Sequence, residues 1–243
     1  MSTLFISDLH LQSERPLITR AFYDFLDQHA SQADALYILG DFFNVWLGDD
    51  DQTPLHREVA ARLKTLSAQG TAVYLMHGNR DFLIGQKFCR QAGAILLDDP
   101  SRIDLYGTPA LLMHGDSLCL DDRSYQRFRR FIRSPLTLGL LRHIPLALRR
   151  RIANDIKRKS GKAKSYKSAQ IMDVTSAEVS RRLQSQGLNV LIHGHTHRPD
   201  IHQVAGNPQQ RIVLGDWDDL GWYLQWHTDG QHQLTSFPIP QAP

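Results

Sequence analysis

The sequence is poor in cysteine, with only Cys89 and Cys119 among its 243 residues. Two thiols cannot build the disulfide framework that stabilises many small secreted proteins, so we expect a reducing environment. The chain contains no run of about eighteen apolar residues, which excludes a typical transmembrane helix. The opening Met1-Ser2-Thr3-Leu4 lacks the basic start and the apolar stretch of a secretory signal. Together these absences predict a cytoplasmic protein.

Acidic residues are scarce between residues 121 and 170. This segment holds 15 of the 28 lysines and arginines but only three acids, for a net charge of +12, whereas the rest of the chain carries −9. Such clustering predicts a surface for an anionic partner, whether phosphate, nucleic acid or anionic lipid. A solvated helical face is the alternative interpretation.

Short apolar runs of strand length and composition recur along the chain. They are Thr3–Ile6, Ala35–Leu39, Thr71–Met76, Ala110–Met113, Val190–Ile192 and Ile212–Leu214. Helix-like stretches at Pro16–Ala30 and Pro54–Gln69 separate the first runs, and each begins at a proline. Strands that alternate with helices indicate an α/β fold.

Side chains that commonly bind metals follow five of these runs. They are Asp8 and His10, Asp41, Asn79, His114, and His195 with His197. Sites in α/β proteins form outside the carboxyl ends of strands, so the five ends should converge. Residues two apart in an extended chain project to the same side, so Asp8 with His10, and His195 with His197, can each face one cavity. We therefore predict one metal site built from these seven residues.

Asp41 has two carboxylate oxygens and a central place in the order of motifs, so we predict that it bridges two ions. Two ions a few ångström apart can hold the attacking and leaving oxygens of a displacement at phosphorus. Oxygen and imidazole ligands without thiolate favour Mn²⁺ over Zn²⁺. His77 and His193 precede motif glycines, and we interpret them as structural residues that support the ligands. Each motif alone is a common structural feature, and only the ordered set indicates a metal site.

The ordered set resembles the calcineurin-like metallophosphoesterase superfamily, whose pattern is Asp-x-His, Gly-Asp, Gly-Asn-His-Asp/Glu, His and Gly-His-x-His. The resemblance covers residues 5 to 197. It implies two β-sheets packed face to face with helices outside. It implies one ion held by Asp8, His10, Asp41 and His197. It also implies a second ion held by Asp41, Asn79, His114 and His195.

Arg80 departs from the superfamily pattern, which has histidine after the Gly-Asn pair. That histidine can protonate a leaving alcohol, whereas arginine cannot act as an acid near neutral pH. Arginine can grip phosphate with two parallel donors. The substrate should therefore have a leaving group that needs no proton, such as the phosphate released from a pyrophosphate. This is a hypothesis for pyrophosphate cleavage over phosphomonoester hydrolysis.

Residues 121–170 interrupt the alternation of strands and helices. We expect two helices, at about 122–133 and 145–160, joined by the apolar connection Leu136–Leu141, with Gly161 closing the second. The chain is thus predicted to be one domain over 1–243, with 121–170 as a helical insertion that overhangs the site as a lid. Its leucines suit the acyl chains of a lipid substrate, but they also suit a small core of the insertion itself.

The Gly-Asn-Arg-Asp motif and the basic, leucine-bearing insertion resemble the UDP-2,3-diacylglucosamine diphosphatases, the pyrophosphatases of lipid A biosynthesis. The resemblance runs the full length of the chain. It implies two Mn²⁺ ions and cleavage to UMP and 2,3-diacylglucosamine 1-phosphate, by a metal-activated water that attacks the phosphorus nearer uridine. The implied catalytic residues are Asp41, Asn79, Arg80 and His195. The implied substrate contacts are Asn79, Arg80, Asp122, Ser160, Lys164, Lys167 and His195, with Trp46 and Tyr125 as further pocket residues.

The basic, apolar insertion also predicts a peripheral seat on the cytoplasmic side of the inner membrane. We expect no nucleic-acid partner and no obligate protein partner. One rival function is a metal-dependent phosphodiesterase or nuclease that uses the basic segment on nucleic acid. Another is a non-catalytic protein that binds metal and a partner, although such a protein has no need of both complete ligand sets.

Overall fold

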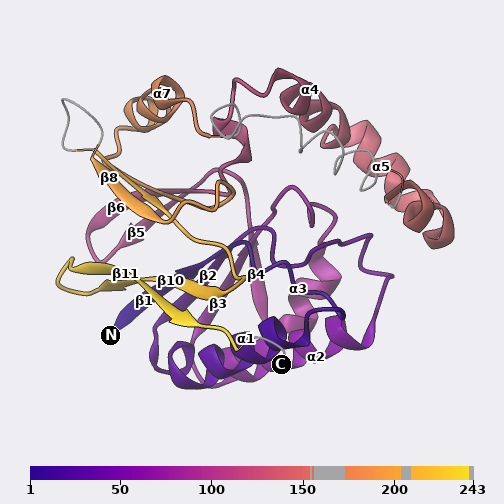
Figure 1. Ribbon diagram of the computed structural model, residues 1–243, viewed down its shortest axis with the longest axis horizontal. Helices are drawn as coiled ribbons and strands as arrows, with labels where there is room; N and C mark the ends of the chain where they lie inside the picture. Colours follow the sequence, from indigo (N-terminus) through magenta and orange to yellow (C-terminus); the bar gives the residue numbers. More distant parts are fainter. Residues whose placement is uncertain (154, 156–172, 204–208, 241–243) are drawn as a thin grey trace.

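The computed structural model describes residues 1–153, 155, 173–203 and 209–240, and its core is a sandwich of two β-sheets (Figure 1). The larger sheet has the strand order β11-β10-β1-β2-β3-β4. Its strands are β1 (Ser2–Ile6), β2 (Ala35–Leu39), β3 (Ala72–Met76), β4 (Ala94–Leu97), β10 (Leu220–His227) and β11 (His232–Pro238). Strands β1 to β4 pair in parallel, and β10 and β11 extend the sheet with antiparallel pairing.

The smaller sheet has the order β5-β6-β7-β9-β8. Its strands are β5 (Ser101–Leu105), β6 (Thr108–Met113), β7 (Val190–His193), β8 (Asp200–Gln203) and β9 (Gln210–Val213). The three central strands β6, β7 and β9 are parallel, whereas the edge strands β5 and β8 are antiparallel to their neighbours. All six predicted strands are confirmed, with ends that differ by at most two residues.

Helices cover the outer faces of both sheets, as predicted (Figure 1). Helices α1 (Pro16–Gln28), α2 (Pro54–Ala68) and α3 (Gln86–Ala92) lie against the larger sheet, and α7 (Ser176–Gln186) lies against the smaller one. Helix α2 begins where the sequence indicates, because Thr53 accepts a hydrogen bond from the backbone N–H of His56 and Pro54 occupies the first turn.

Alternation along the strands builds the layers of the core. In β1, Leu4 and Ile6 pack toward the helices of the larger sheet, whereas Phe5 packs between the sheets. Leu112 and Ile192 meet Phe5 from the smaller sheet. The parallel strands are thus buried on both faces, and their carboxyl ends lie at the same edge of each sheet.

The insertion contains helices α4 (Arg123–Ile132) and α5 (Pro135–His143), which project beyond the sandwich (Figure 1), and residues 146–153 are also helical. The predicted apolar connection Leu136–Leu141 is wrong, because these residues lie within α5. Ser134 caps this helix by accepting a hydrogen bond from the N–H of Thr137, and Pro135 occupies its first turn. The expected end of the next helix, with Gly161, lies outside the described residues.

Among the helices of the described ranges, none is long and apolar enough to cross a bilayer.

Candidate metal centre

The loops after β1, β2 and β7 hold five of the seven predicted ligands in an unusual backbone conformation. Asp8, His10, Asp41, His195 and His197 have φ between 49° and 70°, and Tyr106 is the one other described non-glycine residue with positive φ. Such geometry costs about 1–3 kcal/mol per residue and persists only where its surroundings enforce it. The predicted reason for the pairing of Asp8 with His10 was therefore wrong, since neither residue is extended. Their N–H groups instead donate to the carbonyl oxygens of Gly40 and Asp41, at 3.1 and 2.9 Å.

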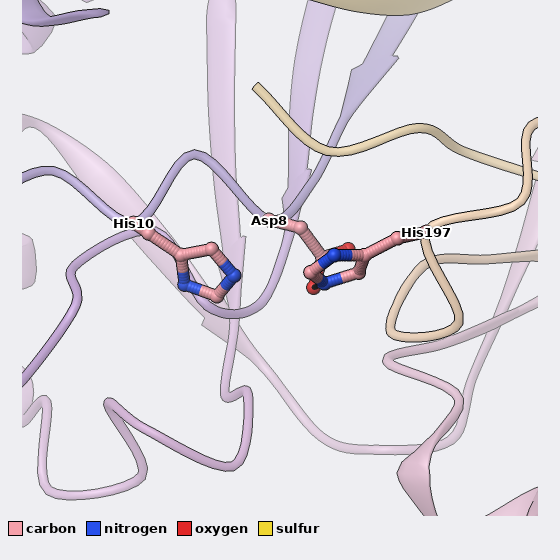
Figure 2. Close-up of side chains that lie close together, drawn as sticks. All are labelled: Asp8, His10 and His197. Atoms are coloured by element: carbon pink, nitrogen blue, oxygen red, sulfur yellow. Dashed lines mark ion pairs between the residues drawn. The ribbon is translucent and has the colours of Figure 1, made fainter. Parts of the chain in front are cut away.

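Asp8 has one carboxylate oxygen held by the protein and one left for a ligand. Its Oδ2 accepts hydrogen bonds from the Ser7 hydroxyl, at 2.6 Å, and from the His195 N–H, at 2.8 Å. Its Oδ1 lies 3.4 Å from His197 Nε2. The side chains of Asp8, His10 and His197 face one another from loops that are far apart in the sequence (Figure 2).

Three buried polar atoms of this group are orphaned. Within the described ranges, nothing hydrogen-bonds to Asp8 Oδ1 or to either ring nitrogen of His10. Burying polar atoms without partners is costly, so their presence indicates that a ligand completes the site. Potential ligand atoms of Asp8, His10 and His197 lie within 4.8 Å of one another, as do those of Asp8, Asp41 and His114. The donor set therefore fits divalent cations.

Asn79, His114 and His195 form the other half of the centre. Asn79 Oδ1 lies 3.0 Å from both His114 Nε2 and His195 Nδ1. Asp41 Oδ1 lies 3.7 Å from His114 Nε2, while Asp41 Oδ2 lies 3.8 Å from His10 Nδ1. His114 Nδ1 pairs with the Leu39 carbonyl oxygen at 2.9 Å, which orients Nε2 toward the centre. Asp41 thus lies between the two groups, where a bridging carboxylate belongs.

Burial and neighbouring charges tune this centre for cations. Burial lowers the pKa of His10 to about 3 and that of His195 to about 4, so both rings are neutral at pH 7 and able to ligate. Burial also raises the pKa of Asp41 to about 7, because its charge lacks compensation in the protein alone. His197 differs: burial opposes its protonation, but the neighbouring carboxylates of Asp216 and Asp8 raise its pKa to about 10.

The raised pKa of His197 predicts that metal binding depends on pH. An ion that binds its Nε2 must displace a proton, so Mn²⁺ affinity is expected to rise about tenfold per pH unit for each proton released between pH 6 and 8. Calorimetric titration at several pH values measures this slope. Asp216→Asn removes the carboxylate 3.0 Å from Nδ1 and should make the slope shallower, whereas His143→Gln, on exposed α5, should not. A pH-independent affinity would contradict the expectation.

Several supporting residues were missed or given no role by the sequence patterns. Asp81 joins the loops after β2 and β3, because its two oxygens accept from the N–H groups of Phe42 and Gly78, each at 2.7 Å. Asp216 orients His197 and follows β9 as part of a Gly-Asp pair, the same signal that identified Asp41. Asn44 accepts a hydrogen bond from Arg80 Nη1 at 2.7 Å, and no local motif marks it.

The two histidines interpreted as structural have backbone partners. His77 Nε2 lies 2.7 Å from the Ile84 carbonyl oxygen, and His193 Nδ1 lies 2.8 Å from that of Gly194. His193 is fully buried.

The structure places the expected substrate contacts and pocket residues in different parts of the protein. Arg80 lies at the centre, with Nε 3.6 Å from Asp41 Oδ2. Asp122 caps α4 by accepting from the Tyr125 N–H, and the Tyr125 ring stacks near His195 with ring centroids 6.2 Å apart. The expectation for Trp46 is wrong, since its side chain is 2% exposed and packs on Phe43 in the core. Ser160, Lys164 and Lys167 lie outside the described residues.

The arginines of the insertion do more than form a solvated face. Arg129 pairs with Asp116 and Asp99, Arg149 pairs with Asp50, and Arg150 pairs with Asp51. Part of the positive charge of 121–170 therefore docks the insertion on acidic residues of the sandwich.

The apolar residues of the insertion divide between core and surface. Leu138 and Leu141 pack partly buried against the core of the larger sheet and its helices. Large side chains are exposed nearby, namely Phe128, Phe131, Leu136, Leu140 and Leu148. Leu138 and Leu141 therefore pack on the sandwich and not in a separate core of the insertion.

Comparison with known proteins agrees with this geometry. Residues 1–199 match the model of the family described as calcineurin-like phosphoesterase. The UDP-2,3-diacylglucosamine hydrolase of Pseudomonas aeruginosa is 55% identical over 241 residues, covering 98% of this chain and 100% of the relative. The hydrolase of the same name from Azotobacter vinelandii is 56% identical over 241 residues with the same coverage. That of Pseudomonas putida is 54% identical over 236 residues, covering 96% and 98%.

Proposed function

This chain belongs to the calcineurin-like phosphoesterase family, and we propose that it hydrolyses the pyrophosphate bond of UDP-2,3-diacylglucosamine at the centre formed by its carboxylates and imidazoles. The products are UMP and 2,3-diacylglucosamine 1-phosphate, which places the reaction in lipid A biosynthesis. The observation that carries the proposal is the full-length identity of 55% to proteins named as hydrolases of this substrate. The clustering of Asp8, His10, Asp41, His114 and His197, with Asn79 close to His114 and His195, supports it.

We propose two Mn²⁺ ions as the cofactors, which would supply an activated water and offset the charge that builds on the phosphoryl oxygens. Asp8, His10, Asp41 and His197 would hold one ion, and Asp41, Asn79, His114 and His195 would hold the other. Attack by water on the phosphorus nearer uridine would release UMP, and the sugar phosphate would depart with the bridging oxygen. Asn79 and His195, which lie 3.0 Å apart, would also contact the phosphoryl group.

Arg80 is proposed to bind the departing phosphate. Its guanidinium is held by Asn44 and lies beside Asp41, so it is already placed at the edge of the metal centre. A planar cation in this position stabilises the developing phosphate charge without giving up a proton. This matches a leaving group that is stable as an anion.

The insertion, residues 121–170, is proposed to act as a lid over the metal centre. It would receive the acyl chains and seat the protein on the inner membrane. Phe131 and Leu136, 66% and 88% exposed, lie among arginines on this segment. Exposed aliphatic and aromatic groups beside cations suit an anionic lipid surface. Asp122 and, beyond the described residues, Ser160, Lys164 and Lys167 are the proposed substrate contacts of the lid.

The lid predicts salt-sensitive membrane association. Binding to vesicles that contain phosphatidylglycerol is expected to weaken as salt rises, because screening reduces attraction between arginine and the anionic surface. Phe131→Asp with Leu136→Asp should weaken it further at every salt concentration. Ile95→Asp, at an exposed position on β4, is the matched control and should have no effect. Vesicle sedimentation measures both, and salt-insensitive binding would contradict the electrostatic part.

The proposed function is tested by UMP release from UDP-2,3-diacylglucosamine with added Mn²⁺. Rapid release that ceases on chelation and returns with Mn²⁺ is the expected result. Cleavage of a nitrophenyl phosphodiester or of nucleic acid, without UMP release, would retain the metal centre but overturn the lipid substrate in favour of a nuclease.

A further inference from the structure

A buried ion-pair network joins helix α4 to the loop that follows β6. Arg129 Nε donates to Asp116 Oδ2 at 2.8 Å, and its Nη2 donates to Asp99 Oδ2 at 3.2 Å. The side chains of Asp116 and Asp99 are 0% and 5% exposed. Buried carboxylates are costly unless they are paired and hydrogen-bonded, so this network holds α4 in one orientation.

Arg133, one turn further along the chain, reaches two of the loops that carry ligands of the second metal site, those after β3 and β6. Its Nη2 donates to the Gly78 carbonyl oxygen at 2.8 Å and lies 3.6 Å from Asp116 Oδ2. Gly78 directly precedes Asn79, and Asp116 is two residues after His114. One guanidinium therefore ties the two loops to each other and to the insertion.

Gly78 lies so close to Asp41 that a movement of its peptide would move the metal ligands. A Cβ built on this glycine would lie 2.0 Å from the backbone nitrogen of Asp41, so the two loops are already in close contact. A shift of the Gly78 peptide would therefore displace Asn79 and press on Asp41. The Gly78 carbonyl lies beyond the end of β3, and Arg133 donates a hydrogen bond to it.

We propose that Arg133 is a positioning residue that sets the affinity of the metal site of Asp41, Asn79, His114 and His195. This inference rests on the proposed two-metal function. By reciprocity, an ion at that site stabilises the docked position of α4, so metal loading and the docking of α4 are coupled. Groups that support metal ligands typically alter affinity about 10- to 100-fold when removed.

Charge and position predict opposite effects for the loss of Arg133. If the guanidinium acted only as a nearby positive charge, its removal would strengthen cation binding, because like charges repel. If it only fastened the insertion, metal affinity would stay the same and substrate affinity alone would fall. The positioning role predicts weaker binding of one ion of the two.

Calorimetric titration of chelator-treated protein with Mn²⁺ separates these roles. Arg133→Met is expected to weaken one of two binding events about 10- to 100-fold. Arg130→Met is the matched control, since Arg130 is exposed on the same helix and donates to its own helix at the Gln126 carbonyl oxygen; its titration should match the unaltered protein. Arg133→Lys keeps the charge but not the planar fork, and should fall between the two.

Unchanged or tighter binding of both ions by Arg133→Met would overturn the inference. A circular dichroism spectrum equal to that of Arg130→Met shows that the fold is retained. Failure of the unaltered protein to bind two ions would instead overturn the metal centre itself, and the inference with it.

Discussion

Replacement of Asp41 by asparagine is expected to lower UMP release by about four orders of magnitude, the scale seen when an essential catalytic group is removed. The expected loss comes from the missing negative charge, because asparagine and aspartate have nearly the same shape. Asparagine keeps an oxygen that can accept the Arg80 N–H, as Asp41 Oδ1 does at 2.9 Å. It lacks the anion that two cations share. Assays of UMP release with and without Mn²⁺ measure the loss, and Asp24→Asn, exposed on α1, is the control.

The same substitution should not destabilise the metal-free protein. Burial raises the pKa of Asp41 from 3.8 to about 7, so ionisation of this carboxyl costs folding stability as pH rises above about 4. Asp41→Asn removes that cost, and its stability relative to the unaltered protein should increase between about pH 4 and pH 7. Addition of Mn²⁺ should stabilise the unaltered protein more than the variant. Equal stabilisation by Mn²⁺, measured by thermal unfolding, would show that Asp41 does not hold the ions.

The central strands and the ligands could be predicted because their signals are local. An apolar run such as Ala35–Leu39, followed at once by Gly40 and Asp41, carries both the strand and the direction in which its end points. In parallel strands this is enough to bring distant residues to one edge. Strands β10 and β11 have weaker sequence patterns. Strand β10 joins the sheet by antiparallel pairing with β1, with Ser2 opposite His227. Such pairing depends on contacts that are remote in sequence.

Helix α5 shows a different failure. Ser134 and Pro135 mark its start, but the apolar run Leu136–Leu141 was predicted to be a connection between helices. The helix forms because Ser134 caps it and because Leu138 and Leu141, on one side of it, pack on the sandwich. Tertiary packing overrode a weak local preference.

The conformation of the ligands was also beyond the sequence. Positive φ at Asp8 or His195 has no local motif, because it is enforced by hydrogen bonds between loops, such as His195 N–H to Asp8 Oδ2. The contacts of Arg133 could not be predicted from the sequence for the same reason. A surplus of positive charge was plain in the segment, but its distribution between ion pairs and free surface depends on acids that lie elsewhere in the chain.

Substitution of Arg80 is expected to change which leaving groups the centre can expel. A charged hydrogen-bond donor to phosphate contributes about 1.5–3 kcal/mol, so Arg80→His should lower kcat/KM for UDP-2,3-diacylglucosamine about 10- to 150-fold. The position of the side chain supports a contact made in the transition state, since Asn44 and Asp41 hold the guanidinium at the centre before substrate arrives. Arg90→His, on the exposed face of α3, is the matched control.

Histidine at position 80 brings a second, opposite effect. Imidazolium can protonate an alkoxide, so the same variant should gain relative activity on phosphodiesters with an alkyl leaving group, which arginine cannot assist. The ratio of the two kcat/KM values is therefore the sharper measurement, because a general loss of folding or of metal would lower both together. A variant that retains the full pyrophosphatase rate would remove the role of Arg80. A parallel fall on both substrates would leave it as a phosphate ligand that has no part in the choice of leaving group.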